Sequence, residues 1–251
     1  LVAPAAGAEH EPDDDRGQAN ELIVGDVGAG YLGWAGDVDV WKLSLEALSA
    51  RNVLDVELSP IDGVAATVEV TDAIGRPLVS RRGARAAPVV VRGLTAQLPA
   101  GAPPFLYVVV RGDRSSPDTA YQLRALGKVA SPDHELEPND TPETAMAMPA
   151  DRRSLRAHWS TGDVDCFAIA PVDAARSLDL SIDTPADVDL AIDVVIDGKL
   201  SAKVDHPGKG AAERLLAAVP AGARAVVRVR GADEPGEAAY ELVVGEGAAP
   251  P

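Results

Sequence analysis

The sequence predicts an all-β protein made of two tandem antiparallel β-sandwich domains. The first observation is a series of short alternating apolar and polar stretches separated by turn residues, which is typical of sandwiches. The second is composition: apolar residues make up 46% and aromatic residues only 4% of 251 residues, so the cores must consist mainly of Val, Leu, Ile and Ala. The 23 glycines and 20 prolines exceed what a helical protein carries. The third observation is an internal repeat.

The repeat is visible as motifs that recur in the same order at nearly constant spacing. Two pairs of motifs, beginning at residues 9 and 135 and at residues 36 and 162, are both 126 residues apart. A final Tyr-x-Leu recurs at Tyr121 and Tyr240, 119 residues apart, so the second copy is slightly shorter. We therefore expect a first domain at residues 9–127, a linker at 128–132 and a second domain at 133–245.

Each copy contains several predicted strands. Residues 53–58 and 178–182 alternate, and residues 67–70 lead into a turn at 72–75. Their counterpart at 192–196 is followed by Asp197-Gly198, a strong hairpin signal.

Two segments are less clear. Residues 211–218 have helical propensity, but their counterpart at 88–94 is typical of a strand, so we expect strands in both places. We expect one short helix at residues 141–145, where Pro142 suits the first helical position and Asp140 or Thr141 can cap it.

One predicted strand in each copy carries paired carboxylates. In residues 162–169, period-two alternation places Asp163 and Asp165 on the same face as Phe167. Residues 36–43 repeat this pattern, with Trp41 in the corresponding position. A carboxylate at the start of a core-facing row needs a partner, because burying it alone is very costly. The candidates are a cation or converging backbone N–H groups.

Bulk charge limits the function classes. The net charge of −16 argues against nucleic acid or an anionic membrane as partner and is compatible with divalent cations. No apolar run approaches the roughly 18 residues that a membrane span needs. The single cysteine, Cys166, excludes an intrachain disulfide, and its position opposite Asp165 predicts a half-buried, unreactive thiol.

The second half of the chain resembles a known family. It contains Glu135-x-Glu137-Pro138-Asn139-Asp140-Thr141-Pro142, then Gly162-Asp163-x-Asp165-x-Phe167 and finally Tyr240-x-Leu242. These motifs, in this order, are similar to the bacterial pre-peptidase C-terminal (PPC) domain, a group that includes the collagen-binding modules of clostridial collagenases. The first half matches less well, since Asp13-Asp14-Asp15 replaces Asn-Asp-Thr.

The resemblance implies a jelly-roll-like sandwich appended to exported bacterial enzymes, often proteases. It also implies calcium binding by the N-terminal acidic segment and an Asp-containing loop. The matching positions are Glu135, Glu137, Asn139, Asp140, Asp163 and Asp165 in the second copy, and Glu9, Glu11, Asp13, Asp14, Asp37 and Asp39 in the first.

Other interpretations of these residues remain open. The Asp residues can instead cap turns and accept backbone N–H bonds, while the Glu residues are solvated. Zinc is disfavoured, because the four histidines (His10, His134, His158 and His206) are scattered without ligand spacing. Paired carboxylates can do acid–base chemistry, but their duplication argues against it, and the sequence contains no common nucleophile, metalloprotease or phosphate-loop motif.

The aromatic residues divide into two groups. We expect Trp41 and Phe167 in the cores, and Tyr121 and Tyr240 as packing residues with a hydroxyl at the rim. Tyr31, Trp34 and Trp159 precede the Gly-Asp-Val-Asp strands and are either a ligand-facing patch or ordinary packing beneath a loop.

Together these features predict a non-catalytic binding or accessory module of an exported protein, whether secreted, periplasmic or at the cell surface. The expected partner is an extracellular protein or polysaccharide, or a partner protein at the cell surface. The alternative is a structural subunit of a cell-surface or fibre assembly.

Overall fold

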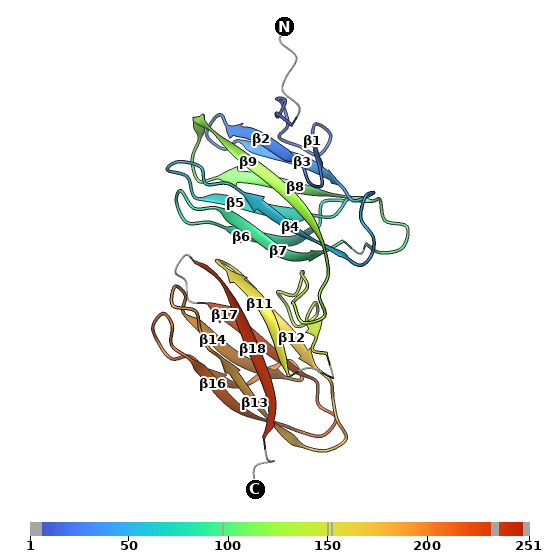
Figure 1. Ribbon diagram of the computed structural model, residues 1–251, viewed down its shortest axis with the longest axis vertical. Helices are drawn as coiled ribbons and strands as arrows, with labels where there is room; N and C mark the ends of the chain where they lie inside the picture. Colours follow the sequence, from blue (N-terminus) through green and yellow to red (C-terminus); the bar gives the residue numbers. More distant parts are fainter. Residues whose placement is uncertain (1–6, 97, 150, 152, 232–235, 248–251) are drawn as a thin grey trace. The chain divides into compact units, whose positions relative to one another are not determined.

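The computed structural model describes residues 7–96, 98–149, 151, 153–231 and 236–247. The chain divides into two compact units, Leu1–Ala130 and Ser131–Pro251 (Figure 1). Within the described residues every regular element is a β-strand. The same residues contain no helix that is long and apolar enough to cross a membrane.

The first unit pairs a five-stranded sheet with a four-stranded sheet. The five-stranded sheet has the order β1 (Asn20–Ile23), β3 (Val38–Ser44), β8 (Phe105–Gly112), β5 (Ala66–Thr71) and β6 (Pro77–Arg82). The four-stranded sheet has the order β2 (Val27–Leu32), β9 (Ser116–Val129), β4 (Asn52–Leu58) and β7 (Val89–Thr95). Neighbouring strands are antiparallel except β1 and β3, which are parallel.

The second unit repeats this topology. Its five-stranded sheet has the order β10 (Met146–Ala147), β12 (Val164–Ile169), β17 (Ala225–Gly231), β14 (Leu190–Ile196) and β15 (Lys199–Val204). Its four-stranded sheet has the order β11 (Ser154–Ser160), β18 (Glu237–Gly247), β13 (Arg176–Ile182) and β16 (Glu213–Val219). The predicted fold class, two β-sandwiches in tandem, is confirmed.

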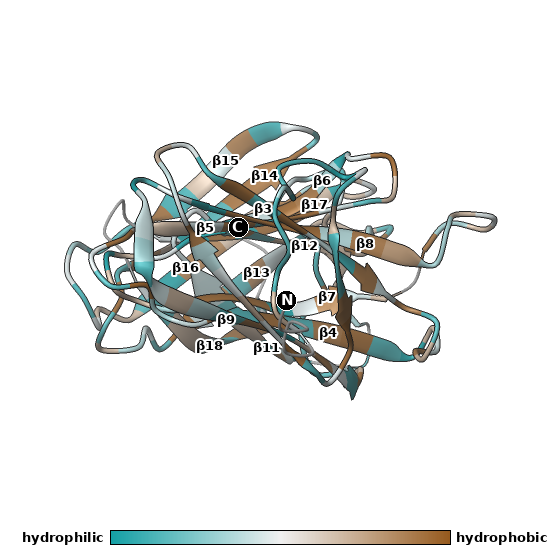
Figure 2. Ribbon diagram, turned by 90° about the horizontal axis from the view of Figure 1, so that it is seen from above, coloured by the Kyte–Doolittle hydropathy of each residue, from teal (hydrophilic) through white to brown (hydrophobic). Residues whose placement is uncertain are grey.

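Each sandwich is held by apolar side chains that alternate toward the space between its two sheets. Trp41 and Phe167, predicted as core residues, are 1% and 0% exposed. Figure 2 shows hydrophobic residues along β4 and β8, whose inward side chains belong to the core of the first unit. Burying a side chain of this size contributes roughly 1.5–3 kcal/mol, so these strand faces dominate the stability of each unit.

Two local predictions were wrong. Residues 141–145 form a turn in place of the expected helix: the Thr144 N–H donates to the Thr141 carbonyl at 3.1 Å, and the two hydroxyls lie 3.0 Å apart. These side-chain hydrogen bonds offer the backbone an alternative to a helix. Cys166 is fully buried, not half-buried, and burial raises the pKa of its thiol to about 12.

The linker and the ambiguous segment of the second copy can also be compared with the strands. Lys128 and Val129, placed in the linker by the repeat, are the last residues of β9. Most of the ambiguous segment 211–218 lies in β16, and most of its counterpart 88–94 lies in β7, so both are strands as expected. In this case the repeat was a better guide than helical propensity.

Candidate metal centre

The N-terminal segment of each unit runs across the rim between its two sheets. In the first unit the Glu9 N–H donates to the Ala29 carbonyl of β2 at 2.9 Å, and the Val40 N–H of β3 donates to the Asp13 carbonyl at 3.1 Å. The segment is therefore tied to one sheet at its start and to the other a few residues later. This crossing places the acidic side chains of residues 9–13 above the start of β3.

The second unit repeats the crossing. The Glu135 N–H donates to the Arg156 carbonyl of β11 at 2.9 Å, and the Cys166 N–H of β12 donates to the Asn139 carbonyl at 3.0 Å. The loop segment thus covers Cys166, which explains why that residue is more buried than strand alternation alone predicts.

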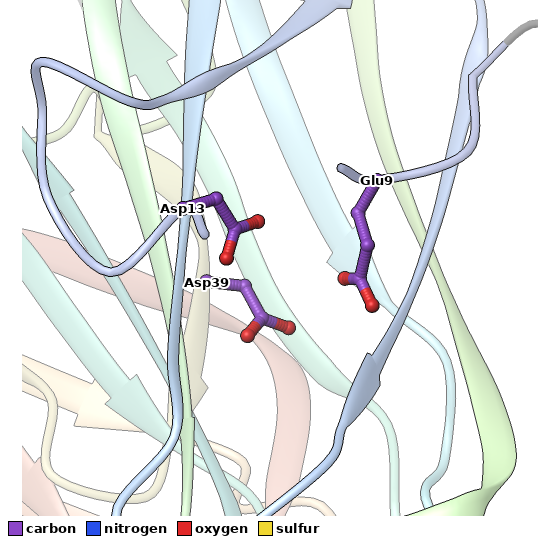
Figure 3. Close-up of side chains that lie close together, drawn as sticks. All are labelled: Glu9, Asp13 and Asp39. Carbon is purple, nitrogen blue, oxygen red and sulfur yellow. The ribbon is translucent and has the colours of Figure 1, made fainter. Parts of the chain in front are cut away.

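In the first unit the crossing brings carboxylates into two overlapping groups. Glu9, Asp13 and Asp39 each offer an oxygen within 4.8 Å of the others, and so do Glu11, Asp37 and Asp39. Figure 3 shows Glu9, Asp13 and Asp39 directed toward a common space. Asp13 and Asp39 are 0% exposed. Asp39 belongs to both groups and is the centre of the cluster.

In the second unit the corresponding group is Glu137, Asp163 and Asp165, again with oxygens within 4.8 Å of one another. All three are buried. Asn139 lies in the same segment, is 0% exposed, and makes no hydrogen bond through its side-chain oxygen or nitrogen. A buried amide without partners is costly, so this residue is suited to a ligand that supplies the missing interaction.

A tyrosine from the last strand of each unit holds the central aspartate. Tyr121 donates to Oδ2 of Asp39 at 2.5 Å, and Tyr240 donates to Oδ2 of Asp165 at 2.5 Å. Oδ1 of Asp39 is buried and makes no hydrogen bond. Burial and the adjacent carboxylate raise the pKa of both tyrosines well above the usual value, so they remain donors.

Backbone N–H groups orient the glutamates. Oε1 of Glu9 accepts from the Tyr31 N–H at 2.7 Å, and Oε1 of Glu135 accepts from the His158 N–H at 2.5 Å. Oε2 of Glu137 accepts from the Asn139 N–H at 2.7 Å. In the alternative interpretation the Asp residues accept backbone N–H bonds and the Glu residues are solvated, whereas these three acceptors are glutamate oxygens.

The carboxyl groups of the first cluster have raised pKa values. Burial raises the pKa of Glu9 and of Asp13 to about 7, and that of Asp39 to about 8, with neighbouring carboxylates adding to each shift. A nearby positive charge stabilises the ionised form of a carboxyl group and lowers its pKa. A cation bound at this cluster would therefore lower these pKa values and keep the carboxylates ionised at neutral pH.

The residue types fit calcium. The three acidic groups found among the described residues consist of carboxylates alone, and calcium prefers six to eight oxygen ligands from carboxylates, amides and carbonyls. Oδ1 of Asp13 and Oδ1 of Asp39 are buried oxygens without a hydrogen bond, as expected for atoms that face a metal ion.

Not every predicted site residue joins a cluster. Among the described residues, Glu135, Asp14 and Asp140 belong to none of the three carboxylate groups. Asp14 is exposed and Asp140 is partly buried. Sequence reasoning predicted Tyr121 and Tyr240 as packing residues with a hydroxyl at the rim. Both rings are buried, and each hydroxyl donates to the central aspartate of a cluster, a contact whose sequence signal was the recurrence of the two tyrosines.

Trp159, Tyr31 and Trp34 differ in their exposure to solvent. Trp159 is 2% exposed and belongs to the core of the second unit. Tyr31 and Trp34 are 44% and 47% exposed, at the end of β2 and in the connection that leads to Asp37. A ligand-facing patch is therefore compatible only with the first unit.

No protein-family model and no curated protein matches this chain. Among solved structures it is similar to the pre-peptidase C-terminal domain of collagenase from Bacillus anthracis, at 17% sequence identity and a TM-score of 0.30. That match covers 47% of this chain and 99% of the collagenase domain.

Proposed function

We propose that each sandwich binds a calcium ion at its acidic cluster and that the chain is a non-catalytic accessory module of an exported protein. The observation that carries the metal proposal is the convergence of three carboxylates in each unit, with buried oxygens that make no hydrogen bond in the first. Bound calcium would supply a positive charge to these carboxylates.

The residues would divide the work as follows. Asp39 and Asp165, oriented by the tyrosine hydroxyls, would be central ligands. The glutamates of the crossing segment would close the site from the other side. Because a cation bound only by the folded state stabilises it by mass action, calcium would hold the crossing segment against both sheets.

The metal proposal is tested by thermal melts and calorimetric titration with calcium and with chelator. We expect two sites in the wild type and one in either Asp39→Asn or Asp165→Asn, since the units carry separate clusters. Asp14→Asn is the matched control, because Asp14 belongs to no cluster, and it should retain both sites. If calcium neither binds nor shifts the melt of the wild type, the acidic residues are turn caps and solvated charges.

The accessory role is tested by binding to insoluble polymers. The exposed Tyr31 and Trp34 lie beside the first cluster and are suited to contact a protein or polysaccharide. We expect retention on insoluble collagen, chitin or peptidoglycan that Trp34→Ala reduces. Ile74→Ala serves as the control, since Ile74 is 64% exposed and lies in the turn between β5 and β6. Self-association in a sizing column, without retention, would favour the structural-subunit alternative.

A further inference from the structure

The second unit has a cavity at the end of β12 opposite its acidic cluster. The cavity has a volume of about 400 Å³, within the range of small-molecule sites. Most of its lining is apolar, and two arginines and one glutamate also line it. The lining residues are Met148, Pro149, Arg153, Ile169, Ala170, Val172, Arg176, Leu178, Val244 and Glu246.

Arg176 is the polar group most deeply set in this cavity. Its side chain is only 17% exposed, and it donates to Oε1 of Glu246 at 2.7 Å and to the Ala170 carbonyl at 2.6 Å. Its Nε is buried and makes no hydrogen bond. Arg153, on the opposite side of β18, is exposed. The cavity therefore combines an apolar interior with two cationic side chains in a chain of net charge −16.

The corresponding end of the first unit differs in charge. The pairing of β4 with β9 and of β13 with β18 shows that Asn52 occupies the position of Arg176. The pairing of β2 and of β11 with the same last strands shows that Asp26 precedes β2 where Arg153 precedes β11. Both arginines are thus particular to the second unit.

That end also differs in packing. The chain from Ser44 to Asn52 is two residues longer than the chain from Ala170 to Arg176 and includes Leu48. Leu48 packs against the first core, and a Cβ on Gly127 would lie 2.8 Å from its side chain. The first unit therefore fills with leucine the end that the second unit leaves open.

We propose that the cavity of the second unit binds a small carboxylate with an apolar tail, such as a medium-chain fatty acid. The tail would lie against Ile169, Leu178 and Val244, and the carboxylate would accept hydrogen bonds from Arg176. An arginine fork recognises carboxylates specifically, whereas an apolar lining alone does not select charge. Phosphate or sulfate alone has no apolar part to contact this lining.

The carboxylate of Glu246 occupies part of this position in the structure. Its side chain is 66% exposed, so its ion pair with Arg176 is a surface pair of low strength. A ligand carboxylate can displace it and also offer an acceptor to Nε of Arg176. Glu246 is thus a competitor that a ligand replaces, and removing its charge favours binding.

The experiment uses the full chain and octanoate as the probe, followed by calorimetry and by the NMR signal of the Met148 methyl group. We expect saturable binding that shifts this signal. Arg176→Gln should weaken binding by at least about tenfold, because a buried charge-assisted hydrogen bond is lost. Arg153→Gln, at an exposed position that does not threaten folding, should weaken it by about threefold. Glu246→Gln should strengthen it.

Matched controls separate recognition of the ligand's charge from apolar contact with its tail. Arg51→Gln removes the same charge near the corresponding end of the first unit and should leave octanoate affinity unchanged. Octylammonium, with the same tail and the opposite charge, should not bind at Met148. Equal binding of octylammonium, binding only of a peptide with an apolar C-terminal residue, or no binding of octanoate at millimolar concentration would each overturn the proposal.

Discussion

The hydroxyl of Tyr240, on β18, donates a 2.5 Å hydrogen bond to Oδ2 of Asp165, on β12. The two residues are far apart in sequence and come from different sheets of the same sandwich. The first unit repeats the contact between Tyr121 and Asp39. In both units a buried tyrosine hydroxyl therefore orients the aspartate at the centre of the acidic cluster. This aspartate is part of the buried interior and is not a surface residue.

Tyr240→Phe should destabilise the second unit by about 1–3 kcal/mol, because it removes a buried hydrogen bond to a carboxylate while keeping the ring. The same change should weaken calcium binding by that unit, since Asp165 loses the donor that orients it. Urea melts and calorimetric titration measure the two effects. Tyr31→Phe is the control, because Tyr31 is exposed; a loss no greater than that of the control would contradict the prediction.

Phe167→Ala should lower the free energy of unfolding by about 3–5 kcal/mol, as truncation of a buried ring does. Trp41 is its counterpart in the first unit, and Trp41→Ala should behave in the same way. Leu216→Ala, at a position 64% exposed, should change stability by less than about 0.5 kcal/mol. Denaturant melts decide the matter: losses below about 1 kcal/mol for the two ring truncations would contradict the assigned cores.

The metal-free first unit should become less stable as pH rises from about 4 to about 8. The pKa values of Glu9 and Asp13 are raised to about 7 and that of Asp39 to about 8, so the folded state binds protons more tightly than the unfolded state. Stability from the neutral forms is complete below the unfolded pKa of about 4 and is lost as pH passes through the folded values.

Denaturant melts in chelator across this pH range test the prediction, and Asp39→Asn should flatten the dependence. Calcium should have the opposite trend, because protonation competes with metal binding and affinity falls in acid. A metal-free first unit that gains stability between pH 5 and pH 8 would show that the cluster is well solvated.

Gly30→Ala should disrupt the first cluster selectively. A Cβ at this position would overlap Oε2 of Glu9 and the hydroxyl of Tyr121. The equivalent position in the second unit is Ala157, since Gly30 pairs with Tyr121 and Ala157 pairs with Tyr240. We therefore expect Gly30→Ala to weaken calcium binding by the first unit only, measured by titration against the Asp165→Asn background. Gly245→Ala, in the second unit, is the control, because its Cβ would come no closer than 3.4 Å to a neighbour.

The local and repeated features of the sequence predicted most of the architecture. Period-two alternation predicted the strand faces that bury Trp41 and Phe167, because strand geometry fixes which side chains share a face. The repeat correctly assigned β16 as a strand against its helical propensity. The structure brings acidic residues from two segments of each copy together around Asp39 and Asp165, and their binding of calcium stays a prediction.

Tertiary structure alone decided which of these residues meet. Glu9 belongs to a carboxylate group while Glu135 does not, each tyrosine hydroxyl donates to the central aspartate of its unit, and a cavity lies beside Arg176 in the second unit. The physical reason is that a sequence pattern fixes the direction of each side chain, whereas contact distances are set by packing between strands far apart in the chain.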